Sequence, residues 1–496
     1  MSWRDIWFQR LAVARVVRQY QEALDGDIQW GDLLLPESEA TSHFLAVGAT
    51  GSGKTLMLRL LLQKVLRKIG HGNDRRALLY DAKQDLLPQL ASICPQTRVV
   101  TINPFDDRGF AWDLSKDIRE ARLAVEIAFT LIPQKHESQP FFSDAARHLL
   151  YGVIISFMLS GFDWTLADLI RVLKNRRLLK QVLRKHAETR DLIGQYFFDP
   201  RLASNIQSTI ATKILPLEPI AASWESAKER IALEDWVRDE LVLVLGNSEI
   251  CRSTIDAINR CIFKRACDLT LHLPESRTRR NWFVVDELAD AGKLDGLVSL
   301  LKKGRSKGAA VALAFQSVSG LRDSNLYGQY FTDELLGQIG NRFIGRLECQ
   351  TTAEWASQLV GDHLVNTKSE SHTNSAQGSS HTVNSQETIR RAVLPGEFMD
   401  LEPCSYESGL HGFFLVRQAG AFFAHLDGSW LFDQTLIPPQ ADVPELITRP
   451  AASQFLRPWT DAQAERFGIR IKKSRVLNER RPENRPDLTS TDDLFD

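Results

Sequence analysis

The fold of this chain is decided by one stretch, Gly48-Ala49-Thr50-Gly51-Ser52-Gly53-Lys54-Thr55, which has the pattern G-x-x-x-x-G-K-[ST]. Its glycines let the backbone curl so that several N–H groups point at one anion. Lys54 can then reach the outer phosphates of a nucleotide, and the Thr55 hydroxyl can bind Mg²⁺. An apolar run at 44–47 precedes the loop, and a helical pattern at 56–62 follows it. We therefore expect a phosphate-binding loop with ATP and Mg²⁺ as ligands.

The composition narrows the class of protein. The 496 residues suffice for about three domains. The 61 basic and 62 acidic residues nearly cancel, so the net charge does not attract nucleic acid or membrane, and any such contact must come from a local patch. The six cysteines form no C-x-x-C pair, which favours reduced thiols over zinc sites or secreted disulfides. No segment approaches the roughly 20 apolar residues that span a bilayer. We expect a cytoplasmic protein without a transmembrane segment.

The order of apolar patterns along the chain predicts an α/β fold. Strand-like runs at 77–81 and 98–102 follow the phosphate loop, and others return at 241–245, 282–286, 309–315 and 342–347. Residues 117–235 between them have an almost purely helical pattern. Near-continuous apolar strands are typical of a parallel sheet covered on both faces. An all-α insertion therefore interrupts a nucleotide-binding domain with a mostly parallel sheet.

These patterns divide the chain into five parts. Residues 1–40 hold an N-terminal helix and a lead-in; the apolar face of that helix fits either packing or docking on a membrane or partner. The nucleotide-binding domain comprises 41–116 and 236–440, with the all-α domain at 117–235 between its halves. Residues 366–388 are a Ser/Thr/Asn/Gln/His tract with almost no large apolar residue, so we expect a flexible loop there. Residues 441–496 are expected to form a polar tail.

The second half of an ATPase site is an apolar strand that ends in a carboxylate. The run 282–285 ends in Asp286 and Glu287. Asp286 would hold Mg²⁺, and Glu287 would polarise the attacking water. Alone, such a pair is a helix-start signal about as often as a catalytic one; the complete phosphate loop favours catalysis.

Two further candidate site residues follow Asp286 along the chain. Arg305 lies 19 positions after Asp286 in a Gly-flanked basic loop, and Gln316 lies 30 positions after Asp286, just past the run 309–315. A guanidinium in such a loop can neutralise a phosphoryl group bound by a neighbouring subunit, although an exposed arginine is more often solvated or in contact with DNA. A glutamine at the carboxyl end of a strand can report whether that phosphoryl group is present.

At this point the chain resembles a known family, the coupling proteins of type IV secretion and conjugation, which are hexameric RecA-like motor ATPases. The resemblance rests on segments along most of the chain: Gly31-Asp32-Leu33-Leu34-Leu35-Pro36 with Glu39 and His43, Asp81-Ala82-Lys83 (D-P-K in the family), Asn103-Pro104-Phe105 with Trp112, and Val393-Leu394-Pro395 up to Met399. It implies a RecA-like P-loop NTPase in which Arg305 matches the arginine finger and Gln316 the sensor at the γ-phosphate.

The resemblance also implies a function and partners. It predicts ATP-driven movement of single-stranded DNA, with a relaxase attached, toward a conjugative transfer channel, by a hexamer that binds DNA without regard to sequence. The family usually begins with two membrane-spanning helices, which this chain lacks, so peripheral recruitment to the bacterial inner membrane is expected instead. Two alternatives stay open: a cytosolic pump for double-stranded DNA, and a nucleotide-gated platform that recruits substrate proteins.

DNA contacts are only weakly indicated by the sequence. The segment 165–190, expected to be a helix, carries seven basic residues against few acids, and either a phosphate-contacting surface or a solvated helix face fits this pattern. These residues are Arg171, Lys174, Arg176, Arg177, Lys180, Arg184 and Lys185.

Overall fold

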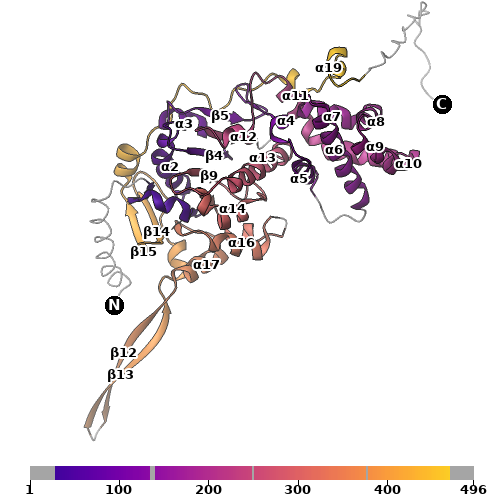
Figure 1. The fold of residues 1–496 in the computed structure, drawn as a ribbon. Coiled ribbons are helices and arrows are strands. Elements are labelled where there is room, and N and C mark those ends of the chain that lie inside the picture. The colour runs from indigo at the N-terminus through magenta and orange to yellow at the C-terminus, as the bar shows by residue number, and fades with distance from the viewer. Residues whose placement is uncertain (1–27, 134–139, 249–250, 325, 376–377, 470–496) are drawn as a thin grey trace, which may run out of the picture.

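The computed structural model describes residues 28–133, 140–248, 251–324, 326–375 and 378–469. It contains a large central sheet with helices on both faces and a helical domain at one end (Figure 1). The expected N-terminal helix lies outside the described residues. The described lead-in forms a hairpin of β1 (Ile28–Trp30) and β2 (Leu33–Leu35), followed by η1 (Glu37–Ser42). None of the helices in the described part is both long and apolar enough to cross a bilayer.

The central sheet has the strand order β15-β14-β11-β3-β10-β9-β4-β8-β5. The strands from β11 to β5 pair in parallel, and β14 and β15 are added antiparallel at one edge. The mostly parallel sheet predicted from the apolar runs is thus confirmed. The strands are β3 (Phe44–Val47), β4 (Arg75–Asp81), β5 (Val99–Ile102), β8 (Val242–Gly246), β9 (Arg280–Val285), β10 (Ala309–Phe315), β11 (Asn341–Ile344), β14 (Leu410–Val416) and β15 (Gly420–Leu426).

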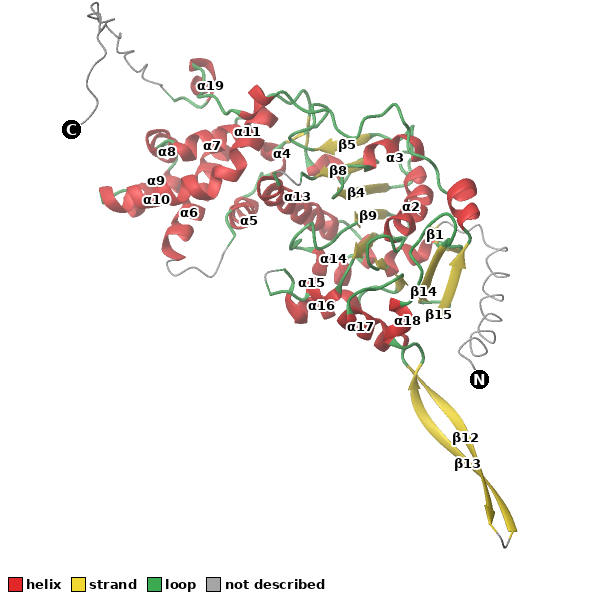
Figure 2. Ribbon diagram, turned by 180° about the vertical axis from the view of Figure 1, so that it is seen from behind, coloured by secondary structure: helices red, strands yellow, loops and turns green. Residues whose placement is uncertain are grey.

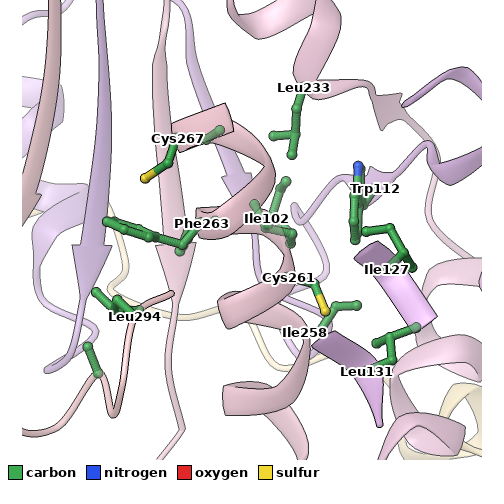
Figure 3. Packing of buried hydrophobic residues seen from close by; sticks show 14 of the residues in the cluster. Ile102, Trp112, Ile127, Leu131, Leu233, Ile258, Cys261, Phe263, Cys267 and Leu294 are labelled. Atoms are coloured by element: carbon green, nitrogen blue, oxygen red, sulfur yellow. The ribbon is translucent and has the colours of Figure 1, made fainter. Parts of the chain in front are cut away.

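Both faces of the sheet are covered because its central strands β3 and β10 carry apolar side chains throughout. In β3, Phe44 and Ala46 belong to the apolar cluster of α2 (Lys54–Val65) and α3 (Leu86–Ile93). Leu45 and Val47 belong to the cluster of α13 (Arg252–His272) and α14 (Leu297–Lys303). Figure 3 shows part of the second cluster, where side chains of α13 meet those of the sheet and the helical domain: Ile102, Trp112, Ile127, Leu131, Leu233, Ile258, Cys261, Phe263, Cys267 and Leu294.

The all-α insertion stands at one end of the molecule, beyond α13 (Figures 1 and 2). The segment expected to be one helix is broken at Asn175, whose side chain accepts hydrogen bonds from the backbone of Arg177 and Leu178 and so begins a new helix. The helices are α5 (Ala121–Leu131), α6 (Pro140–Ser160), α7 (Leu166–Lys174), α8 (Arg176–Leu183), α9 (Ala187–Tyr196), α10 (Pro200–Ile214) and α11 (Glu218–Glu225). Short strands β6 (Ala111–Trp112) and β7 (Arg230–Ile231) pair where the chain enters and leaves the insertion.

The prediction of a flexible loop at 366–388 is wrong about the secondary structure. The chain instead forms an antiparallel hairpin of β12 (Asp362–Ser375) and β13 (Gly378–Arg391), paired in register from Asp362↔Arg391 to Ser375↔Gly378. It projects away from the body next to α17 (Gln350–Val360) (Figures 1 and 2). The expectation considered only burial of apolar side chains, whereas a two-stranded ribbon satisfies its backbone hydrogen bonds across the pair without burial.

The expected polar tail also needs correction in its described part. Residues 441–469, which we call the C-terminal strap, pack against the body, and Arg449 and Trp459 are buried. Arg449 donates to the carbonyl oxygens of Asp106 (2.8 Å) and Ser223 (3.0 Å). Trp459 donates to Asp168 Oδ1 at 2.7 Å, just before α19 (Asp461–Arg466). A few anchoring side chains fix this segment, and they are hidden in a composition that is polar on average.

Candidate nucleotide-binding site

The phosphate loop lies where expected, between the carboxyl end of β3 and the first turn of α2. Gly51 and Gly53 have positive φ angles of 75° and 89°, which side chains other than that of glycine rarely allow. The loop is tied to its surroundings by two backbone hydrogen bonds: Ala49 N–H donates to Arg346 O at 2.7 Å, and Cys404 N–H donates to Gly51 O at 2.8 Å. The loop conformation is therefore fixed in advance of any ligand.

One pocket brings together the loop and the other residues expected in the site. Because β9 and β10 are parallel neighbours, residues that follow them, Asp286 and Gln316, meet at the same edge of the sheet. Glu287 joins them there. The pocket is lined by Thr50, Gly51, Ser52, Gly53, Lys54, Thr55, Leu56, Lys83, Asp286, Glu287, Asp290, Gln316 and Cys404.

The Lys54 ammonium is held inside the loop. Its Nζ donates to Gly48 O at 2.7 Å and to Ala49 O at 3.0 Å. Burial lowers the pKa of Lys54, and the nearby carboxylates of Glu287 and Asp286 oppose that shift. The side chain is thus aimed at the loop before a phosphate is bound.

Thr55 and Asp286 form a donor set that suits Mg²⁺. The Thr55 hydroxyl donates to the Asp286 carboxylate, with Oγ1 at 3.3 Å from Oδ1 and 3.2 Å from Oδ2. A hydroxyl and a carboxylate are hard oxygen ligands of the kind that Mg²⁺ prefers next to a nucleotide. Glu287 is buried beside them, and burial raises the pKa of its carboxyl, opposed by Lys54 and by a hydrogen bond from Gln316.

Arg305 does not line this pocket. It is exposed in the short helix η4 (Arg305–Lys307) at the amino end of β10, whereas the pocket lies at the carboxyl ends of the strands. Its loop is supported by the buried His43, whose Nε2 donates to Leu301 O and whose Nδ1 accepts from Val311 N–H, both at 3.2 Å. Burial lowers the pKa of His43 to about 4, which keeps the ring neutral. No sequence pattern around His43 predicts this supporting contact.

Lys83 lines the pocket, although the sequence motif Asp81-Ala82-Lys83 does not predict a role for it in the site. It follows β4, the parallel neighbour of β9, so its ammonium reaches the same edge of the sheet. Lys83 Nζ donates to Thr55 Oγ1 at 3.0 Å and lies 3.3 Å from Asp286 Oδ2. Its position depends on strand order, which differs from chain order.

The seven basic residues at 165–190 fall into two groups. On α7, Arg171 is buried in an ion pair with Glu225, and Lys174 pairs with Glu218 at 2.6 Å. These two are structural. The other five lie on α8 and in the short turn that follows it.

Four cations of α8 and α9 form what we call the basic ladder: Arg176, Lys180, Arg184 and Arg190. The first three are spaced by four residues and so share one helix face. Within the described ranges, no acidic side chain forms an ion pair with any of the four. Burial, followed by the charges of Arg176 and Arg184, lowers the pKa of Lys180. Arg176 and Lys180 lie over the ring of Phe197, 5.8 and 4.9 Å from its centroid, and the next residue, Phe198, is 73% exposed.

The fold and the pocket together define an α/β protein of the phosphate-binding-loop class. Within that class, residues 27–418 match the family model of the type IV secretion-system coupling protein DNA-binding domain, and the chain belongs to this family. The family resemblance seen in the motifs is thereby confirmed.

The chain is similar to two named coupling proteins. The coupling protein TraD of Escherichia coli (strain K12) is 23% identical over 358 residues, which are 71% of this chain and 48% of TraD, so the chain spans about half the length of this curated relative. An unbound form of the bacterial conjugative coupling protein TrwB covers 88% of this chain and 94% of its own, with 19% identity and a TM-score of 0.68. The structure of TrwB with ADP and Mg²⁺ gives the same TM-score and identity, with 88% and 95% covered. These similarities confirm the RecA-like α/β fold.

Proposed function

We propose that this protein is an ATP-driven DNA translocase of the type IV coupling-protein kind. The observation that carries the proposal is that the expected catalytic residues are divided between the carboxyl ends and the amino ends of the sheet strands. Lys54, Asp286, Glu287 and Gln316 line one pocket, while Arg305 stands at the opposite edge. A complete site then needs the Arg305 of a neighbouring subunit, as in a hexameric ring that hydrolyses ATP at its interfaces. The structures of TrwB with ADP and Mg²⁺ and with nucleotide analogues support ATP and Mg²⁺ as ligands.

Each residue of the pocket has a distinct task in this mechanism. The N–H groups of the loop and the Lys54 ammonium bind the outer phosphates, and Thr55 and Asp286 would hold Mg²⁺, which would supply positive charge beside those phosphates. Glu287 orients the attacking water and draws its proton, and its neighbour Gln316 senses the γ-phosphate. Arg305 of the next subunit offsets the charge that develops on the transferred phosphoryl group.

The transported substrate in this proposal is single-stranded DNA, with a covalently attached relaxase and the components of a transfer channel as further partners. The protein would act in the cytoplasm, recruited peripherally to the bacterial inner membrane. ATPase rates measured without DNA, with single-stranded DNA and with double-stranded DNA, alongside the mass of the oligomer, test this proposal. We expect stimulation by single strands and a hexameric mass. Greater stimulation by duplex would favour a double-strand pump, and no stimulation by either would favour a recruitment platform.

The basic ladder supports a DNA contact that ignores sequence. Its cations lack acidic partners, so they are available to phosphates, and the exposed Phe198 offers a surface for base stacking. The triple variant Arg176→Gln/Lys180→Gln/Arg184→Gln should weaken single-strand binding. Each lost phosphate contact makes the negative slope of log affinity against log salt shallower by roughly 0.7, so the loss of three contacts makes it shallower by about 2.

A salt titration monitored by fluorescence anisotropy measures this slope. The control variant Lys116→Gln/Arg122→Gln/Arg238→Gln removes the same charge from exposed residues that pair with Asp113, Glu120 and Glu234. We expect the control to keep the slope of the unmodified protein. An equal decrease in both variants, or none in the ladder variant, would exclude the ladder as the DNA contact.

A further inference from the structure

Lys83 occupies an unusual position for a lysine of a phosphate site. The other lysine of the pocket, Lys54, donates to two neutral carbonyl oxygens. Lys83 instead bridges Thr55 Oγ1 at 3.0 Å and Asp286 Oδ2 at 3.3 Å, the two side chains that suit Mg²⁺. Its side chain is 55% exposed, so it can move away without disturbing the core.

The Lys83 ammonium and a metal ion compete for these oxygens. Mg²⁺ requires ligand oxygens at about 2.0–2.1 Å. A metal that close to Thr55 Oγ1 and Asp286 would stand beside a positive charge that is itself only 3.0 and 3.3 Å from the same atoms. Like charges at such a separation repel strongly in a partly buried site. Bound metal and the observed position of Lys83 therefore exclude one another.

We propose that Lys83 is a displaceable counter-cation of the metal site, which prevents firm binding of a divalent cation until a nucleoside triphosphate brings the charge that offsets it. The proposal rests on the nucleotide site proposed above but not on DNA translocation. The displaced ammonium would stay near the Asp85 carboxyl, two residues further along the chain, whose pKa is raised by burial and lowered by the charge of Lys83. Metal and nucleotide would then bind as one unit.

Binding of Mn²⁺ to the full-length protein tests this role without any turnover. Free Mn²⁺ is measured by electron paramagnetic resonance during titration, with and without ATP. Lys83→Met keeps most of the length of the side chain but removes its charge, and we expect it to bind Mn²⁺ roughly tenfold more tightly than the unmodified protein when ATP is absent. Lys83→Arg retains the charge and should behave like the unmodified protein. Lys64→Met removes an exposed lysine near the end of α2, nine residues after Thr55, and should also have no effect.

The two arms of the titration separate this inference from the proposed nucleotide site. Equal or weaker Mn²⁺ binding by Lys83→Met without ATP would overturn the role of Lys83. If the protein and ATP together bind no more Mn²⁺ than ATP alone, in any of the variants, the Thr55–Asp286 metal site itself is wrong. Circular dichroism melting curves confirm that each variant is folded at the temperature of the titration.

Discussion

Replacing Lys54 by alanine is expected to lower the ATPase rate by at least about a hundredfold while the protein stays folded. The ammonium is the cation that pairs with the outer phosphates both at rest and in the transition state, and no other side chain of the loop can replace it. The fold should survive this change even though the Lys54 side chain is buried. The reason is that burial disfavours the charged form, as the lowered pKa shows, so removing the ammonium also removes a desolvation cost.

The ATPase rate of Lys54→Ala, measured with its melting temperature, checks this result. Glu287→Gln is the informative companion because it leaves Lys54 and the metal ligands in place. It should bind ATP with nearly unchanged affinity and lose turnover, since the amide cannot draw a proton from the attacking water. A Lys54→Ala protein that hydrolyses ATP near the original rate would contradict the central assignment of the pocket.

Arg305→Ala is expected to abolish hydrolysis without weakening ATP binding, because in the proposed ring its side chain would act on the nucleotide of another subunit. An arginine supplied in trans increases turnover by roughly 10³ to 10⁵ in phosphoryl-transfer systems. The location of Arg305 at the amino end of β10, away from the pocket, is what such an action requires. Activity of the unmodified protein should accordingly rise more than linearly with protein concentration.

Mixing two inactive variants is the decisive measurement. Arg305→Ala subunits keep an intact phosphate loop, and Lys54→Ala subunits keep the arginine. A mixed ring contains some interfaces at which both functional halves meet, so part of the ATPase activity should return on mixing. A mixture of Lys54→Ala with the double variant Lys54→Ala/Arg305→Ala provides the control and should stay inactive. Full activity of Arg305→Ala as a dilute monomer would show that the residue has no such role.

The sequence predicts those residues of the pocket that directly follow a strand. Asp286 and Gln316 each follow an apolar run, and parallel strands bring such residues to one edge whatever their order. Lys83 could not be assigned in this way, because its contact with Asp286 requires β4 to lie next to β9, although some 200 residues separate them in the chain. His43 was missed for a related reason, since its partners Leu301 and Val311 come from elements far along the chain.

The elements that were predicted wrongly show what apolar periodicity leaves out. The hairpin of β12 and β13 is stabilised by backbone pairing that no pattern of apolar residues records. Asn175 ends one helix and begins the next through a single side-chain cap, which interrupts a stretch whose composition is helical throughout. The C-terminal strap depends on a few anchors, such as Arg449, in an otherwise polar segment.

The strap changes how the all-α domain can move. A domain that is joined to its neighbour by two adjacent connections can rotate about a hinge at those connections. Here the two connections lie beside β6 and β7. Arg449 adds a third attachment by binding a loop of the nucleotide domain and α11 with one guanidinium, and Trp459 continues it to α7. Three separate attachments leave no free axis of rotation. We therefore expect the all-α domain, with the basic ladder, to move together with the nucleotide domain and not against it.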